Sequence, residues 1–254
     1  MWVLLACVVP PELRETGDTA DTAPVDPTAG WVGGEGPTAT VSGRAFLFGP
    51  APGQTLTGAT VSVLEAPEQR GVVAEDGTFA LEVASGAALS FVLEQEGLAT
   101  IQSATIPIGP EGLDDLGFQV PTPDIVELMA LAAEVDLDAD ACQLVTTVSS
   151  AASPPYGGAG VGEPDAIVTL SPALPDDATG PVYFDYLSDS LILPDPALTA
   201  TTIDGGVIYG NLPTGEWTLH AEKVGVTFTE PVARCHPGAI VNAAPPHGVE
   251  VVEG

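Results

Sequence analysis

One stretch of the chain occurs twice, and this repetition limits what the chain can fold into. Residues Asp76–Leu98 (DGTFALEVASGAALSFVLEQEGL) align without a gap to Asp204–Val226 (DGGVIYGNLPTGEWTLHAEKVGV). In both copies the odd offsets from the Asp are mostly apolar, while the even offsets are mostly small or polar. This period of two is typical of half-buried β-strands, so each copy predicts two strands. The odd offsets hold Phe79, Leu81, Leu89, Phe91 and Leu93 in the first copy, and Val207, Tyr209, Trp217, Leu219 and Ala221 in the second.

An Asp-Gly pair opens each copy and predicts a turn. Gly accepts a positive φ without a Cβ clash, and Asp can accept a hydrogen bond from the backbone two residues on. In the second copy, Leu212–Trp217 reads LPTGEW, where Pro presets φ for a turn and Gly lets the chain reverse. We expect the second strand of each copy to end before Gly97 or Gly225.

Short motifs in both halves resemble those of one protein family. VSGRA at 41–45, GATVSV at 58–63 and DGTF at 76–79 follow one another as in carboxypeptidase regulatory-like domains. DAIVTL at 165–170, followed by the second Asp-Gly and LPTGEWTL, is similar to the same pattern. The resemblance implies a small transthyretin-like β-sandwich of about seven strands in each half, with no catalytic residues of its own. The first half departs from the pattern by lacking an L-P-x-G-x-Y loop, and the second by a long insertion at 171–200.

Length and composition agree with two small all-β domains. A chain of 254 residues can hold one large domain or two small ones, and the repeat favours two. Its 29 Gly and 25 Pro lie between short β-branched runs, as in turn-rich β structure. The predicted fold class is all-β, with two transthyretin-like or Ig-like sandwiches at 38–121 and 141–254. One short helix at 122–140 joins them, and a disordered tether at 1–37 precedes them.

The charge excludes one class of partner. With 5 Lys and Arg against 35 Asp and Glu, the net charge of −30 repels polyanions, so no nucleic-acid partner is expected. The acidic surface either keeps an apolar-rich secreted protein dispersed as a monomer or recognises cations and basic partners.

The N-terminus resembles that of a bacterial lipoprotein. Met1–Cys7 reads MWVLLAC and ends like a lipobox, which implies that Cys7 is diacylated and becomes the first residue. The apolar run is short and no Lys or Arg precedes it; a start further upstream explains both, and a frayed apolar terminus is the alternative. Glu15–Pro24 then repeats Asp-Thr without apolar periodicity, which is typical of a flexible tether. These features predict a membrane-anchored protein of the cell envelope, at the outer membrane, the cell surface or in the periplasm.

Two further segments lie between the predicted sandwiches. Residues 121–124 (PTPD) open a helix in which Thr122 or Asp124 can cap the free amides. The helix is either a connector packed at the domain junction or a partner-binding helix. Residues 136–140 (DLDAD) begin like a calcium loop, but Ala141 and Thr147 stand where an EF-hand needs Gly and Glu. The apolar stripe of the helix comprises Ile125, Leu128, Met129, Ala132 and Val135.

Three cysteines allow one disulfide if Cys7 carries lipid. Cys142 and Cys235 then remain as a pair in an oxidising compartment. A bond closing a loop of about 90 residues stabilises the fold by up to roughly 4–5 kcal/mol in the chain-entropy description. Two buried thiols are the alternative.

No catalytic or metal-binding residues are predicted, and no cofactor. His220, His236 and His247 all lie in the second half, together with Tyr183, Tyr186 and Tyr209. Intradiol dioxygenases, whose sandwich is related, hold iron with two Tyr and two His, but their closely spaced His pair is absent here. The chain has no G-x-S-x-G elbow, and carboxylate pairs such as 114–115 and 176–177 stand in polar turns.

Two loops of the second half bear on ligand binding. The Gly-rich run at 156–162 lacks the Lys-Ser/Thr of a phosphate-binding loop. The insertion at 171–200 is either an exposed loop with a binding surface or an extra hairpin at the edge of the sandwich.

The sequence therefore predicts a non-catalytic, lipid-anchored spacer or accessory binding protein with an unknown protein or glycan partner. A carbohydrate-binding pair is the alternative and would need exposed aromatics, for which Tyr156, Tyr183 and Tyr186 are available. A metal-dependent enzyme of the dioxygenase-like fold ranks third.

Overall fold

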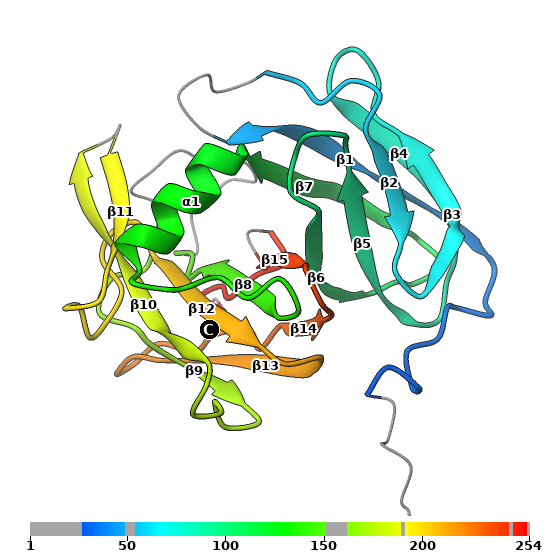
Figure 1. Cartoon of the computed structure of the whole chain (residues 1–254). Helices are drawn as coiled ribbons and strands as arrows, with labels where there is room; N and C mark the ends of the chain where they lie inside the picture. The colour runs from blue at the N-terminus through cyan, green and yellow to red at the C-terminus, as the bar shows by residue number, and fades with distance from the viewer. Residues whose placement is uncertain (1–26, 49–53, 151–161, 189–190, 244–245, 253–254) are drawn as a thin grey trace, which may run out of the picture.

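The computed structural model describes residues 27–48, 54–150, 162–188, 191–243 and 246–252 (Figure 1). The chain is mostly β, as predicted, and one helix, α1 (Pro123–Ala132), is present in these ranges. The strands are β1 Thr38–Phe48, β2 Thr60–Val63, β3 Ala66–Val72, β4 Thr78–Ala84, β5 Ala88–Glu94, β6 Ile101–Pro107, β7 Leu113–Pro121, β8 Cys142–Thr147, β9 Ile167–Ser171, β10 Thr179–Ser188, β11 Leu191–Asp195, β12 Gly206–Leu212, β13 Gly215–Glu222, β14 Val232–Cys235 and β15 Ile240–Ala243.

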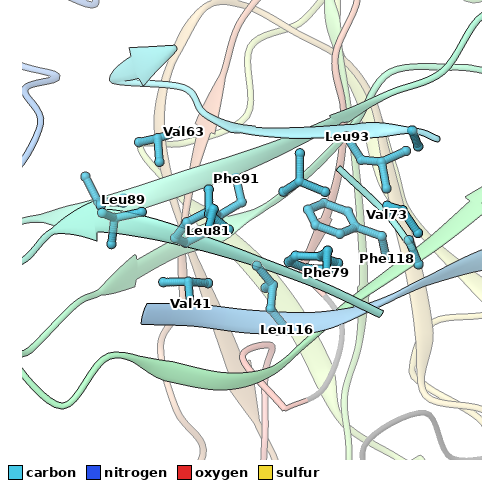
Figure 2. Close-up of a cluster of buried hydrophobic side chains, with 14 of the residues drawn as sticks. Val41, Val63, Val73, Phe79, Leu81, Leu89, Phe91, Leu93, Leu116 and Phe118 are labelled. Carbon is cyan, nitrogen blue, oxygen red and sulfur yellow. The ribbon is translucent and has the colours of Figure 1, made fainter. Parts of the chain in front are cut away.

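The first half consists of two layers around one core. β4, β1 and β7 form one layer, and β3, β2, β5 and β6 form the other. Along β4 the apolar residues Phe79 and Leu81 are buried while Glu82 is exposed, so the predicted alternation is confirmed in this strand; in β5 the even-offset residue Ser90 is buried as well. Figure 2 shows this core, in which the rings of Phe79 and Phe118 lie 5.8 Å apart.

The second half has a core of its own, built from strands on both sides. β11, β10, β12, β8 and β15 follow one another in the sheet, and β14, β13 and β9 continue it beyond β6. Tyr209 of β12 and Trp217 of β13 belong to the same buried cluster, although their strands do not pair. The two strands of the first repeat copy also lie on opposite sides of their core, because β4 pairs with β1 while β5 pairs with β2 and β6. Each repeat copy therefore crosses from one side of its core to the other.

The two Asp-Gly turns have the predicted geometry. Gly77 has a φ of 81° and Gly205 a φ of 77°, values that favour glycine. The amide of Thr78 donates to Asp76 Oδ1 at 3.0 Å, and the amide of Gly206 donates to Asp204 Oδ2 at 3.2 Å. In both copies, the Asp carboxylate therefore accepts the predicted hydrogen bond from the amide of the second residue after it.

Strand β6 belongs to both halves. It pairs with β5 in the first half, runs parallel to β15, and bridges to β14 where Val232 lies opposite Thr105. The side-chain amide of Gln102 on β6 is buried and donates to the carbonyl of Arg234 at 2.6 Å. A continuous sheet therefore links the halves in addition to the expected helix (Figure 1). The expected boundaries at 38–121, 122–140 and 141–254 stay predictions.

Helix α1 lies within the expected connector, and of its predicted stripe Ile125, Met129 and Ala132 are half-buried and Val135 is buried, whereas Leu128 is exposed. None of its residues is fully buried, and Leu128 is 43% exposed although the stripe placed it inward. Thr122 is the N-cap residue but makes no side-chain capping bond, and Pro123 occupies the first turn. Ala133, which follows the helix and lies outside the stripe, is buried as well. In the described part of the chain, no helix has the length and apolar character needed to cross a membrane.

The end of the expected tether pairs with the backbone of the first half. The amide of Gly36 donates to the carbonyl of Ser85 at 2.8 Å, and the amide of Ser85 donates to Pro37 O at 3.0 Å. The composition resembles a flexible linker, but glycine here permits close approach of two backbones: a Cβ on Gly34 would lie 2.1 Å from the carbonyl oxygen of Ala84. The predicted lipidation site Cys7 and the rest of the tether lie outside the described residues.

Candidate functional site

The predicted disulfide is present. Cys142 of β8 and Cys235 of β14 are bonded, with their Cα atoms 5.5 Å apart and both side chains fully buried. The alternative of two buried thiols is therefore wrong. The bond connects the part of the sheet before β6 to the part after it.

Two of the tyrosines that an iron site would need have a structural role. Val168 of β9 donates its amide to the hydroxyl of Tyr183 at 3.0 Å, and Tyr209 donates its hydroxyl to the Val168 carbonyl at 2.9 Å. Because β13 is the one strand that pairs with β9 in the described part of the chain, these hydroxyls close the other edge of β9. Burial raises the pKa of both phenols. Their hydrogen-bonding groups are thus used within the core.

The histidines do not gather around these tyrosines. His220 faces Glu230 through Nδ1 at 2.9 Å, which agrees with its outward position on the strand. His236 contacts the neighbouring Pro237 carbonyl, and burial lowers the pKa of His247 despite its hydrogen bond to the backbone of Asp114. Among the described residues, no three His, Cys, Asp or Glu side chains are grouped to hold a metal ion.

The DLDAD segment forms a turn. The amide of Asp140 donates to Asp138 Oδ1 at 2.9 Å, and the Asp138 amide donates to the side chain of Asn211 at 3.0 Å. The Asp138 carboxylate therefore organises its own loop. The Gly-rich run at 156–161 lies outside the described residues.

The insertion forms the expected extra hairpin. β10 and β11 pair antiparallel, and β11 stands at the edge of the sheet with β10 as its partner in the described structure. Asp185 and Tyr186 of β10 line one side of an open hollow of about 430 Å³, and the segments 164–165 and 198–203 line the rest.

Threonine hydroxyls hold the walls of the hollow together. Thr201 Oγ1 donates to the carbonyl of Glu163 at 2.7 Å, and Thr202 Oγ1 donates to the carbonyl of Phe184 at 2.8 Å. Asp165, Asp185 and Tyr186 also line the hollow. Of the three tyrosines weighed for sugar binding, Tyr186 is at this surface, Tyr183 is in the core, and Tyr156 lies outside the described residues.

A buried ion pair joins the halves. Arg234 of β14 contacts Glu65 Oε1 through Nη1 at 2.5 Å and Glu216 through Nε at 2.9 Å. The Glu65 side chain is fully buried and also accepts the amide of Ser90 at 3.0 Å. Burial works against the charge of Arg234, but the two carboxylates outweigh it and raise the arginine pKa. Because Glu65 follows β2, this pair connects the first half to the second.

Sequence reasoning did not identify this ion pair. A signal was present, because Arg234 is one of only 5 basic residues and stands between apolar residues in the strand Val232–Cys235. A charge in such a strand needs a buried partner. Nothing in the sequence singles out Glu65 among 35 acidic residues.

Comparisons with known proteins give only distant structural likenesses. No protein-family model and no curated protein matches the chain. The Bacillus anthracis TIE protein has 12% identity and a TM-score of 0.26, with 83% of this chain and 34% of that protein covered. A mutant of the shaft pilin SpaA from Lactobacillus rhamnosus GG has 11% identity and a TM-score of 0.25, with 86% and 100% covered. The minor pilin GBS52 of Streptococcus agalactiae has 8% identity and a TM-score of 0.25, with 85% and 97% covered.

This chain thus spans about a third of the TIE protein, of which 34% is covered. TM-scores near 0.25 are too low to carry an argument about function. The class that the chain's own features define is a mostly β protein whose two cores are joined by a shared strand.

Proposed function

We propose that the chain is a non-catalytic, lipid-anchored protein of the cell envelope that acts as a rigid spacer or an accessory binding module. The observation that carries the proposal is the sharing of β6, because one strand contributes hydrogen bonds to both halves. The buried pair of Arg234 and Glu65 adds a second connection across the same junction. Two cores that share a strand and a buried ion pair are suited to holding a fixed distance.

Side chains suited to chemistry have structural partners in the second half. The phenols of Tyr183 and Tyr209 bind the backbone of Val168, and the two cysteines of this half form a disulfide. This use of reactive groups supports a structural assignment over the dioxygenase-like enzyme.

Rigidity can be tested by measuring distances between the halves. Val72 in the first half and Val224 in the second are 63% and 101% exposed, so both accept a spin label introduced through Val72→Cys and Val224→Cys in a Cys7→Ser background. A rigid spacer gives one narrow distance distribution by pulsed electron resonance. A broad or two-peaked distribution would contradict the proposal.

The anchor is tested separately through Cys7. We expect the intact mass of the native protein from membranes to include acyl chains, and Cys7→Ser to abolish them and to release the protein from the membrane fraction. The double variant Cys142→Ser, Cys235→Ser is the matched control and should retain the lipid. An unmodified mass for the membrane-derived wild type would refute the anchor while leaving the spacer role intact.

An accessory binding role would use the hollow beside β10 and β11. Tyr186 offers an aromatic face there, and Asp165 and Asp185 offer acceptors of the kind that hydrogen-bond sugar hydroxyls. Glycan-array binding that Tyr186→Ala removes, and that Val224→Ala leaves unchanged, would favour this role. Absence of any glycan binding by the wild type would exclude the carbohydrate-binding alternative.

A further inference from the structure

Residues 27–37, called the strap below, contact the first half through backbone pairing. The hydrogen bonds of Gly36 and Pro37 with Ser85 extend the antiparallel ladder of β1 and β4 beyond its first pair, Thr38 and Ala84. The hydroxyl of Ser85 also donates to the carbonyl of Pro37 at 2.8 Å. This end of the strap is therefore fixed by three hydrogen bonds to one residue.

The other end of the strap contacts the second half. A turn in which the Trp31 amide donates to the Thr28 carbonyl at 2.9 Å precedes the crossing. The guanidinium carbon of Arg234 lies 5.7 Å from the centroid of the Trp31 ring, within the range of a cation–π contact. Because Arg234 is already bound to Glu65 and Glu216, Trp31 lies over the ion pair that joins the halves.

The glycines of the strap differ in what surrounds them. A Cβ on Gly34 would lie 2.1 Å from Ala84 O and 2.4 Å from Ser85 O, so a side chain cannot be accommodated without moving the backbone. A Cβ on Gly30 would meet nothing within 4 Å. The strap therefore needs glycine at one position for contact with the body and tolerates alanine at the other.

We propose that the strap is a conformational clasp that covers the junction between the halves and controls its opening. While the strap is seated, Trp31 shields the ion pair of Arg234 and Glu65, and the two halves move as one. When the strap lifts, water reaches the ion pair and the junction opens more often. Residues 1–26 join the body through the strap, so any force or cleavage acting on them reaches the junction first.

Hydrogen exchange of the full-length protein tests the clasp. The reporters are peptides that contain Ser90, whose amide binds Glu65, and peptides from β14, which carries Arg234. Trp31→Ala should speed exchange of both reporters by about 2- to 30-fold. The lower limit corresponds to the loss of an exposed cation–π contact, and the upper limit to the loss of a desolvated one. Gly34→Ala should act in the same direction by displacing the strap.

Two matched controls and one rescue make the test specific. Val32→Ala changes a neighbouring side chain that is 65% exposed, and Gly30→Ala adds a methyl group in open space; both should exchange like the wild type. Trp31→Phe keeps an aromatic face and should restore most of the protection. Unchanged exchange of peptides from β12 and β13 shows that each variant is folded.

The clasp is refuted if Trp31→Ala and Val32→Ala give the same exchange at Ser90 and β14. It is also refuted if both strap variants loosen residues 27–37 while the two reporters stay protected, because the strap would then be a bound tail with no hold on the junction. These outcomes do not depend on lipid at Cys7, so the clasp and the anchor are tested independently.

Discussion

At the scale of single residues, Val168 shows how side chains can complete a sheet. Its amide and carbonyl, on the outer edge of β9, are bound by Tyr183 and Tyr209 at 3.0 and 2.9 Å. Tyr209→Phe leaves the Val168 carbonyl buried without its donor, so we expect the free energy of unfolding to fall by about 1–3 kcal/mol. Urea denaturation monitored by circular dichroism measures this loss.

The control for that prediction is Thr169→Val on the same strand. Thr169 is exposed, so its substitution should change the stability by no more than about 0.5 kcal/mol. Equal stability of Tyr209→Phe and the wild type would show that the hydroxyl does not close the strand edge.

The two Asp-Gly turns predict opposite pH effects. Asp76 is fully exposed, and hydrogen bonds from the hydroxyl and amide of Thr78 lower its pKa. Asp204 has Gly206 in the place of Thr78, and burial raises its pKa despite the bond from the Gly206 amide. A carboxyl group whose pKa is lowered in the folded protein stabilises the fold at pH values above the ordinary carboxyl pKa. This stabilisation is lost as the pH falls. A carboxyl group whose pKa is raised in the folded protein stabilises the fold at pH values below the ordinary carboxyl pKa. This stabilisation is lost as the pH rises.

Substitution of each Asp by Asn tests these signs. From pH 3 to pH 7, Asp76→Asn should fall progressively behind the wild type in unfolding free energy, whereas Asp204→Asn should progressively gain on it. Denaturant titrations on fresh protein at several pH values give both slopes, and freshness matters because Asn before Gly deamidates. Slopes of the same sign would contradict the assigned environments.

At the scale of elements, the alternation of apolar and polar residues predicts the buried positions where one face of a strand meets a core and the other meets solvent. β4 is such a strand, and its buried positions were predicted correctly. β6 is different, because six of its seven residues are buried and they include Gln102, Ser103 and Thr105. These polar side chains indicate a solvent-facing strand in the sequence, yet Gln102 binds Arg234 of the second half, and Ser103 and Thr105 bond to β5 of the first half. A contact between distant segments has no local pattern, and for the same reason Glu65 could not be foreseen as the partner of Arg234.

The disulfide was predicted on the assumption that Cys7 carries lipid, because that assignment leaves Cys142 and Cys235 as one pair. It links strands β8 and β14 across a sequence separation of 93 residues. Loss of such a long loop constraint should lower the unfolding free energy by up to about 4–5 kcal/mol in Cys142→Ser, Cys235→Ser. Urea denaturation of the variant and of the wild type, with and without reductant, measures the loss. An effect of reductant on the variant would point to a cause other than this bond.

At the scale of the whole molecule, the shared strand predicts that the halves unfold together. Leu93 lies in the first core and Leu219 in the second, and both are fully buried. Replacement of either by Ala should destabilise its own core by about 2–5 kcal/mol. If one half unfolds and takes β6 with it, the hydrogen bonds between β6 and the other half are lost. The substitution should therefore lower the stability of both halves.

Native-state hydrogen exchange distinguishes joint from separate unfolding, because it reports the opening free energy of each strand. In Leu93→Ala, β12 and β13 in the second half should lose as much protection as β4 in the first, and Leu219→Ala should give the reciprocal result. Val224→Ala, at a fully exposed position, should leave both halves within about 0.5 kcal/mol of the wild type. If each substitution affected only its own half, the bonds of β6 would be too weak to couple the two cores, and the chain would act as a flexible pair of modules in place of a rigid spacer.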